Sequence, residues 1–129
     1  MILVDSSVWI DYFNGVATRE TDLLDGYLGE EPLLTGNLIL TEVLQGFRED
    51  RDFRRARAAL ETLSFEPMVG LEIALASEQN YRRLRALGVT VRKTIDVIIA
   101  TFCVERGHRL LHSDRDFTLM EEPLGLQSV

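Results

Sequence analysis

The sequence contains little cysteine and histidine and no long apolar run, and each of these shortages excludes a class of protein. One cysteine among 129 residues cannot form an internal disulfide, which excludes a disulfide-stapled secreted scaffold. The two histidines, His108 and His112, do not show the spacing of a zinc site. No apolar run approaches the roughly 20 residues that cross a bilayer, and the N-terminus lacks the pattern of a secretory signal. We therefore expect a cytoplasmic protein with no membrane segment.

Positive charge is also in short supply, because the net charge is −7. A passive nucleic-acid binder is usually basic, since phosphate contacts supply most of its affinity. The arginines nevertheless gather in two stretches. The first, from Arg48 to Arg57, is interspersed with acids, whereas the second has no acid between Gln79 and Ile95. Either stretch could be an ordinary solvated helix face, but the second leads directly to Asp96.

The length and the pattern of apolar residues predict one α/β domain over residues 1–129. Short apolar segments predict strands and alternate with segments of helical spacing, which is typical of a sandwich around a mainly parallel sheet. Ser6, Asn37 and Thr94 are the expected helix caps, and Thr18 with Thr21 does not match a capping box. The expected strands are 2–4, 31–36, 66–70 and 108–113, with 126–129 as a possible last strand. The expected helices are 6–14, 18–29, 37–47, 51–65, 71–88 and 94–107.

Acidic residues stand at the margins of the most apolar segments. Asp5 follows the strand "ILV", Glu42 lies within "NLILTEVLQGF", and Asp96 occupies the first turn of "TIDVIIATFCV". Asp114 and Asp116 come just after the strand "HRLLHS". An unpaired charge in such a place costs several kcal/mol. In open parallel sheets, ligands bind beyond the carboxyl ends of the strands, so we expect these acids to form one site.

Each acid also has a purely structural explanation. Asp96 could simply favour a helix N-terminus through the helix dipole, and Asp5 could accept backbone hydrogen bonds at the start of a helix. Glu42 could lie on the exposed side of its helix, and Asp114 and Asp116 could be turn residues. These explanations account for the acids singly and account poorly for all of them together.

A divalent cation resolves the repulsion between clustered carboxylates. A site made of carboxylates, without histidine or cysteine, favours Mg²⁺ or Mn²⁺ over Zn²⁺. Such an ion polarises a phosphoryl group and lowers the pKa of an attacking water. We interpret His112 as a strand residue that packs inside the protein, and Cys103 as a small core residue.

Four segments together resemble the PIN-domain ribonucleases, and specifically the VapC toxins of type II toxin–antitoxin systems. They are "MILVDSSVWIDYF", "LTEVLQG", "GVTVRKTIDVIIATFCVERG" and "LLHSDRDF", which occur in the family's order and span nearly the whole chain. The resemblance implies a three-layer α/β/α fold with a central parallel sheet. It also implies a Mg²⁺- or Mn²⁺-dependent endoribonuclease site on the acids Asp5, Glu42, Asp96 and Asp114, with Asp116 as a fifth acid at the metal.

The resemblance further implies neighbours for this site. Ser6, Thr94 and Ser113 adjoin the acids and are expected to orient them by hydrogen bonds. Basic side chains expected to hold RNA phosphates are Arg82, Arg83, Arg85, Arg92, Lys93 and Arg115. Arg82 or Arg85 could instead pair with Glu78 on the same helix. Transfer RNA is the favoured substrate class.

The family also implies a homodimer and a VapB-type antitoxin, with which the toxin assembles into a heterotetramer or a larger complex. The expected groove for the antitoxin is lined by the aromatic residues Trp9, Tyr12, Phe13, Phe47 and Phe53. Ordinary core packing is the alternative for each of these rings.

Three other functions are alternatives to a VapC-like ribonuclease. A haloacid-dehalogenase-type phosphatase needs a second aspartate two positions after the first, where this chain has Ser7. A PIN-related nuclease could act on DNA, or on RNA outside a toxin system. A catalytically silent PIN domain would only bind a partner. Metal-dependent cleavage distinguishes the silent domain from the enzymes, and a comparison of DNA with RNA distinguishes the nucleases.

Overall fold

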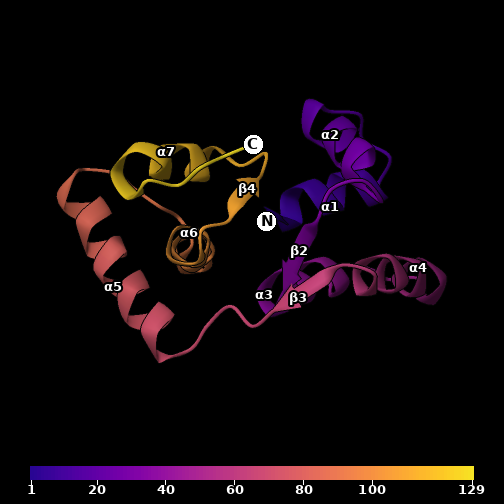
Figure 1. Cartoon of the computed structure of the whole chain (residues 1–129), viewed down its shortest axis with the longest axis horizontal. Coiled ribbons are helices and arrows are strands. Elements are labelled where there is room, and N and C mark those ends of the chain that lie inside the picture. The colour runs from indigo at the N-terminus through magenta and orange to yellow at the C-terminus, as the bar shows by residue number, and fades with distance from the viewer.

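A parallel four-stranded sheet forms the centre of the computed structural model, which describes residues 1–129. The strand order is β3-β2-β1-β4, so β1 lies inside the sheet and pairs with both β2 and β4 (Figure 1). Because β1 and β4 are parallel neighbours, their carboxyl ends lie at the same edge. The strands are β1 (Ile2–Val4), β2 (Leu33–Gly36), β3 (Ser64–Glu66) and β4 (Arg109–Leu111).

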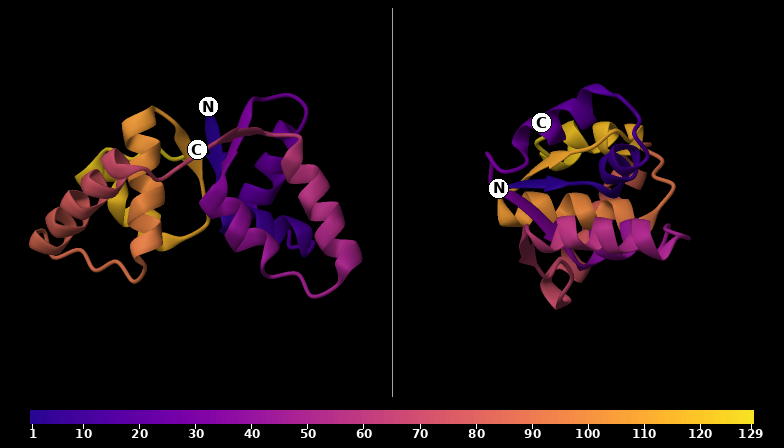
Figure 2. Two further views of the ribbon diagram at one scale, coloured as in Figure 1. Left: turned by 90° about the horizontal axis from the view of Figure 1, so that it is seen from below. Right: turned by 90° about the vertical axis from the view of Figure 1, so that its right-hand side faces the viewer.

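Seven helices cover the two faces of the sheet, which confirms the predicted three-layer α/β/α fold. One layer holds α1 (Ser6–Phe13), α2 (Arg19–Tyr27), α3 (Asn37–Leu44) and α4 (Asp50–Glu61). The other holds α5 (Leu71–Ala86), α6 (Thr94–Arg106) and α7 (Arg115–Leu124). The left view of Figure 2 shows these two groups on opposite sides of the sheet. No helix is long and apolar enough to cross a membrane.

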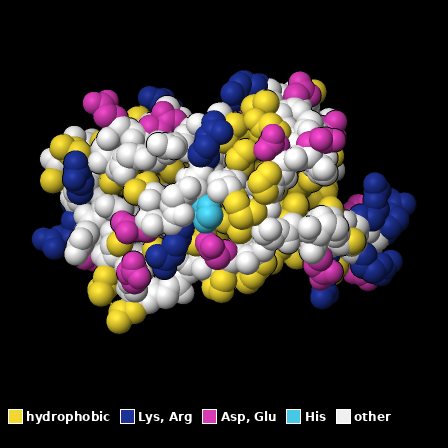
Figure 3. Space-filling view, in the orientation of Figure 1, with side chains coloured by type: hydrophobic (Ala, Val, Ile, Leu, Met, Phe, Trp, Pro, Cys, Tyr) yellow, Lys and Arg dark blue, Asp and Glu magenta, His cyan; other side chains and the backbone are white.

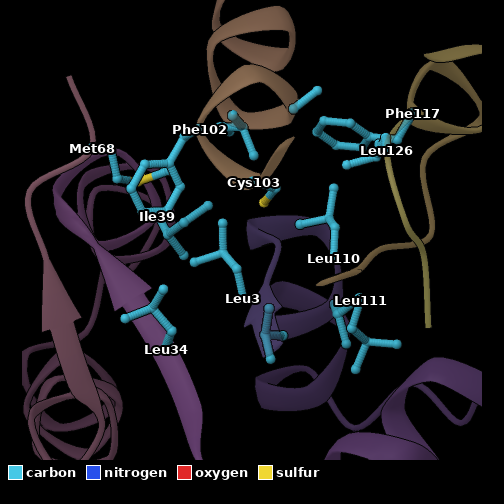
Figure 4. Close-up of a cluster of buried hydrophobic side chains, with 14 of the residues drawn as sticks. Leu3, Leu34, Ile39, Met68, Phe102, Cys103, Leu110, Leu111, Phe117 and Leu126 are labelled. Atoms are coloured by element: carbon cyan, nitrogen blue, oxygen red, sulfur yellow. The ribbon is translucent and has the colours of Figure 1, made fainter. Parts of the chain in front are cut away.

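A single cluster of 25 buried hydrophobic residues forms the core. Leu3 pairs in register with Leu34 and Leu110, so these three side chains leave the sheet on the same face. Phe102 and Cys103 of α6 are fully buried beside them (Figure 4). Cys103 is therefore a core residue, as predicted.

Strand β3 comes earlier in the chain than predicted, at 64–66 and not at 66–70. Pro67 explains the difference, because it has no N–H to continue the hydrogen-bonded ladder. The next residue, Met68, turns away from the sheet and its N–H donates to Asn37 Oδ1 at 3.1 Å. Asn37 is consequently the first residue of α3 and Gly36 is its cap, so the prediction of Asn37 as cap is wrong.

Other helix starts also differ from the prediction. Asp5 caps α1 in place of Ser6, and Lys93 precedes α6 in place of Thr94. Thr18 and Thr21 do form a capping box, because the Thr21 hydroxyl accepts from the Thr18 N–H at 2.8 Å, in the position where Glu or Gln is usual.

The helix α7 was not predicted, because the sequence "DRDF" suggests a turn. Asp114 caps this helix, and Phe117 and Met120, three residues apart, are both buried. After α7, the possible last strand appears only as an isolated parallel bridge between Leu110 and Ser128.

Candidate metal centre

The four acids expected to form one site come from four separate elements. Asp5 follows β1, Glu42 lies in α3, Asp96 lies in the first turn of α6, and Asp114 follows β4. They are close enough to affect one another's protonation, because Asp5, Asp114 and Glu42 each raise the pKa of Asp96. The structure therefore brings together the acids that the sequence singled out.

Asp5 is both a helix cap and a buried acid of the site, with only 4% of its surface exposed. Its Oδ2 accepts from the Ser7 N–H at 3.1 Å and from the Ser7 hydroxyl at 2.6 Å. Burial raises the pKa of Asp5, and the two hydrogen bonds from Ser7 oppose this increase. Because both contacts use Oδ2, they leave Oδ1 available for a ligand.

Asp96 combines burial, like charges around it and an oxygen without a partner. It is 5% exposed, and its Oδ2 is buried without any hydrogen-bond partner. Burial, followed by the negative charges of Asp5 and Asp114, raises the pKa of Asp96 to about 7. Lys93 opposes this increase. A buried carboxylate oxygen without a donor, surrounded by like charges, is a position that favours a cation.

Glu42 is half-buried and faces the cluster. The Ser6 hydroxyl donates to Glu42 Oε1 at 3.2 Å, which joins α3 to the start of α1. Partial burial raises the pKa of Glu42, and the charge of Asp5 raises it further. The explanation of Glu42 as an exposed helix residue therefore does not hold.

Asp114 repeats the arrangement of Asp5 at the end of the neighbouring strand. Its Oδ1 accepts from the Asp116 N–H at 2.9 Å and caps α7. Asp116 is 7% exposed and pairs with Arg92, whose Nε lies 3.3 Å from Asp116 Oδ2. Arg92 Nη2 also lies 3.9 Å from Asp114 Oδ1. Arg92 thus compensates part of the negative charge at this end of the site.

The donor set fits a hard divalent cation. Every candidate ligand is a carboxylate oxygen, which suits Mg²⁺ or Mn²⁺ bound with part of its water shell. No group of three or more His, Cys, Asp or Glu side chains is close enough together, as placed here, to hold a metal ion. The unpartnered Asp96 oxygen and the repulsion among the acids are the two observations that favour a metal here.

The other predicted site residues lie at different distances from this centre. Lys93 affects the pKa of both Glu42 and Asp96, so it lies beside them. Arg82 pairs with Glu78 at 3.4 Å, as the alternative interpretation proposed. Arg85 lies over the Tyr81 ring at 5.3 Å and lines a groove of about 360 Å³ that Arg82 and Thr94 also line. Arg83 and Arg115 are exposed.

Ser7, next to the acids, has a role in the site that the sequence did not assign. Ser7 donates to Asp5 through both its N–H and its hydroxyl. A serine two positions after a capping aspartate is a signal that could have identified it. His112 accepts from the Asp114 N–H at 3.3 Å, and its burial lowers its pKa, so it is a neutral packing residue as expected.

Comparison with known proteins identifies the fold. The PIN-domain profile matches residues 2–123. The chain belongs to the PIN-domain family. Ribonuclease VapC11 of Mycobacterium tuberculosis is 29% identical over 133 residues, a match that covers 99% of this chain and 97% of that protein. The predicted resemblance to VapC-type PIN domains is thereby confirmed.

Solved structures show the same PIN fold at low sequence identity. FitAcB from Neisseria gonorrhoeae superposes with a TM-score of 0.76 and 14% identity, covering 99% of this chain and 96% of that chain. VapBC2 from Rickettsia felis, bound to a promoter DNA fragment, superposes with a TM-score of 0.73 and 12% identity. The match covers 100% of this chain and 98% of that chain. At this identity, the two comparisons establish the fold.

Proposed function

We propose that this PIN domain is a Mg²⁺- or Mn²⁺-dependent endoribonuclease and the toxin of a VapBC-type toxin–antitoxin system. The observation that carries the proposal is the cluster of Asp5, Glu42, Asp96 and Asp114, in which Asp5 and Asp96 are buried and Asp96 Oδ2 has no partner. Its full-length similarity to VapC11, a ribonuclease, supports RNA as the substrate. Transfer RNA is the favoured class because of the family resemblance.

We assign each acid of the cluster a role in phosphodiester hydrolysis. Asp5 and Asp96 would hold the ion most directly, since both are buried at the centre of the cluster. Glu42 and Asp114 would complete the carboxylate set and orient the attacking water. Asp116 would hold Arg92 at this end of the site through their ion pair. When bound, the divalent ion polarises the phosphoryl oxygen and lowers the pKa of the water.

Basic residues at the rim would bind the RNA phosphates on either side of the scissile bond. Lys93 stands beside the acids, and Arg115 is exposed at the start of α7. Arg82, Arg83 and Arg85 lie on α5 and would hold a longer stretch of the RNA strand. An acidic chain with basic side chains around a metal-loaded cluster would thus bind a polyanion locally.

The decisive experiment compares wild type with Asp96→Asn on total RNA, with Mg²⁺, with Mn²⁺ and with EDTA. The substitution keeps the side-chain shape and removes one charge from the cluster. We expect discrete RNA fragments that require metal and are reduced by at least about 100-fold in the variant. Equal behaviour of the two proteins would remove the basis of the proposal, and preferential cleavage of DNA would favour the other nuclease class.

A groove on the other helical layer supports the proposed antitoxin partner. It has a volume of about 700 Å³ and is lined by rings of α1 and of the segment after α3, among them Tyr12, Phe13 and Phe47. Arg48 and Arg55 also line it, together with the acids Glu49 and Asp52, and Figure 3 shows basic side chains, here all arginine, gathered at the outer end of α4. Trp9 is fully buried, which makes it a core residue and not part of the groove surface.

We expect Phe47→Ser to weaken co-purification with a co-expressed VapB-type antitoxin and to leave RNA cleavage by the free protein unchanged. The rings of Phe47 and Phe13 pack edge to face, with 5.8 Å between their centroids. Phe47 lines the groove and is not part of the acidic cluster. A complex of unchanged stability would place the antitoxin on another surface.

A further inference from the structure

Ser7 makes more contacts than a helix needs at its second residue. Its backbone N–H already satisfies the capping carboxylate of Asp5 at 3.1 Å. The hydroxyl adds a second and shorter hydrogen bond of 2.6 Å to the same oxygen, Oδ2. This doubled contact fixes the rotation of the Asp5 carboxylate and therefore the direction in which Oδ1 points.

The same hydroxyl also reaches a segment 106 residues further along the chain. The Ser113 N–H donates to Ser7 Oγ over 3.4 Å. A serine hydroxyl has one proton to give and two lone pairs that accept, so Ser7 can donate to Asp5 while it accepts from Ser113. Its oxygen thereby connects the acid that follows β1 to the loop that carries Asp114.

Without the hydroxyl, no side-chain hydrogen bond would connect Asp5 to the loop that carries Asp114. The Asp5 N–H donates to the Leu111 carbonyl at 2.9 Å, which fixes the strand ends but not the residues beyond them. Asp114 lies three residues after Leu111, and its contacts with His112, Asp116 and Arg92 do not reach Asp5. Ser7 is therefore the side chain that links the first and the last of the four acids.

We infer that Ser7 is a positioning residue that holds the Asp5 carboxylate and the Asp114 loop in the arrangement that a metal site requires. The part of this inference that concerns a metal rests on the proposed function. The link between Asp5 and the Asp114 loop rests only on the hydrogen bonds of Ser7. Ser7 lies beyond the set of Ser6, Thr94 and Ser113 that the sequence suggested, and it acts through other residues and not on the RNA.

The first test measures Mn²⁺ binding by titration calorimetry in wild type, Ser7→Ala and Ser7→Thr. Ser64→Ala serves as the matched control, because Ser64 is exposed on β3 at the far edge of the sheet. We expect Ser7→Ala to weaken binding by about 10-fold or more, and Ser7→Thr, which keeps the hydroxyl, to restore most of it. Equal affinities of wild type and Ser7→Ala would overturn the inference.

A second test needs no metal, so that failure of the proposed function stays distinguishable from failure of this inference. The amide proton of Ser113 is followed by NMR in the metal-free proteins. We expect its chemical shift to move upfield in Ser7→Ala and to return in Ser7→Thr, with no change in Ser64→Ala. If wild type binds no Mn²⁺, the metal site fails, and an unmoved Ser113 signal would refute the link itself.

Discussion

At the scale of single residues, Asp5 and Asp114 show how a carboxylate at a strand end can serve the fold and the site together. Each uses one oxygen to cap the helix that follows and keeps the other oxygen free. The structural and the functional explanations of these acids are therefore not alternatives. Asp96 differs, because neither a cap contact nor an ion pair satisfies its Oδ2.

We expect the metal-free protein to lose stability as the pH rises from about 4 to about 7. The folded state raises the pKa of Asp96 from 3.8 to about 7, so it binds a proton more tightly than the unfolded chain does in this range. The raised pKa values of Asp5 and Glu42 act in the same direction. The pKa of His112 is lowered from its ordinary value of 6.5. At pH values below 6.5, this shift makes the stability increase with pH and so opposes the effect of the acids.

Asp96→Asn isolates the contribution of Asp96, because it removes this titration and leaves His112 in place. Urea unfolding at several pH values should show that the free energy of unfolding of the variant increases relative to that of wild type as the pH rises. The relative increase should be on the order of a few kcal/mol by pH 7. A difference between the two proteins that stays constant with pH would contradict the electrostatic account of this site.

Mg²⁺ should reverse the same instability. A ligand that binds only the folded state stabilises it by about 2.7 kcal/mol at 100 times its dissociation constant. We expect the melting temperature of wild type near neutral pH to rise with Mg²⁺ concentration and that of Asp96→Asn to respond much less. An equal increase in both proteins would indicate that the ion binds elsewhere.

At the scale of elements, close packing between β2 and the segment after β3 places α3 and hence Glu42. Gly36 ends β2 directly before α3, and a Cβ at this position would contact the Met68 side chain and lie 2.9 Å from the Glu66 carbonyl oxygen. The backbone of β3 cannot move away easily, because it is paired with β2. Glycine is therefore required here for a close approach and not for an unusual backbone angle.

Gly36→Ala should destabilise the protein by about 1–3 kcal/mol, as expected for overpacking. Gly26→Ala is the matched control. Gly26 lies within α2 and a Cβ there meets nothing within 4 Å, so the change should stabilise by about 0.5–1 kcal/mol. Thermal unfolding of both variants provides the comparison, and two changes of the same sign would contradict the packing argument.

The elements also show which parts of the structure the sequence could predict. Asp5, Glu42, Asp96 and Asp114 were identifiable because each interrupts or borders an apolar segment, and apolar patterning is a strong signal. The helix α7 was missed because its start, "DRDF", has the composition of a turn and its cap is itself a site acid. The shift of β3 and the role of Ser7 depend on contacts between distant segments, which local patterns do not contain.

At the scale of the whole molecule, the chain after α7 protects one edge of the sheet. The Leu110 N–H donates to the Gln127 carbonyl at 2.9 Å, and the Val129 N–H donates back to the Leu110 carbonyl at 3.0 Å. Leu126 is buried in the core. These contacts satisfy the free side of β4, which would otherwise present unpaired backbone groups to solvent.

Removal of residues 126–129 should therefore lower stability and retain the site. Burial of a leucine side chain contributes about 1.5–3 kcal/mol, and the two backbone hydrogen bonds add to this. We expect a lower melting temperature, with metal-dependent cleavage preserved at low temperature. Loss of cleavage in a protein that still shows native circular dichroism would reveal a direct role of these residues in the site.

The central position of β1 has a consequence for the order of events during synthesis. Strand β1, which ends directly before Asp5, is synthesised long before its partner β4, which is followed by Asp114 more than 100 residues after Asp5. Parallel neighbours so distant in sequence pair late in folding. The nascent chain therefore carries an incomplete cluster until β4 has left the ribosome, more than 100 residues after Asp5. The four acids meet only after that point.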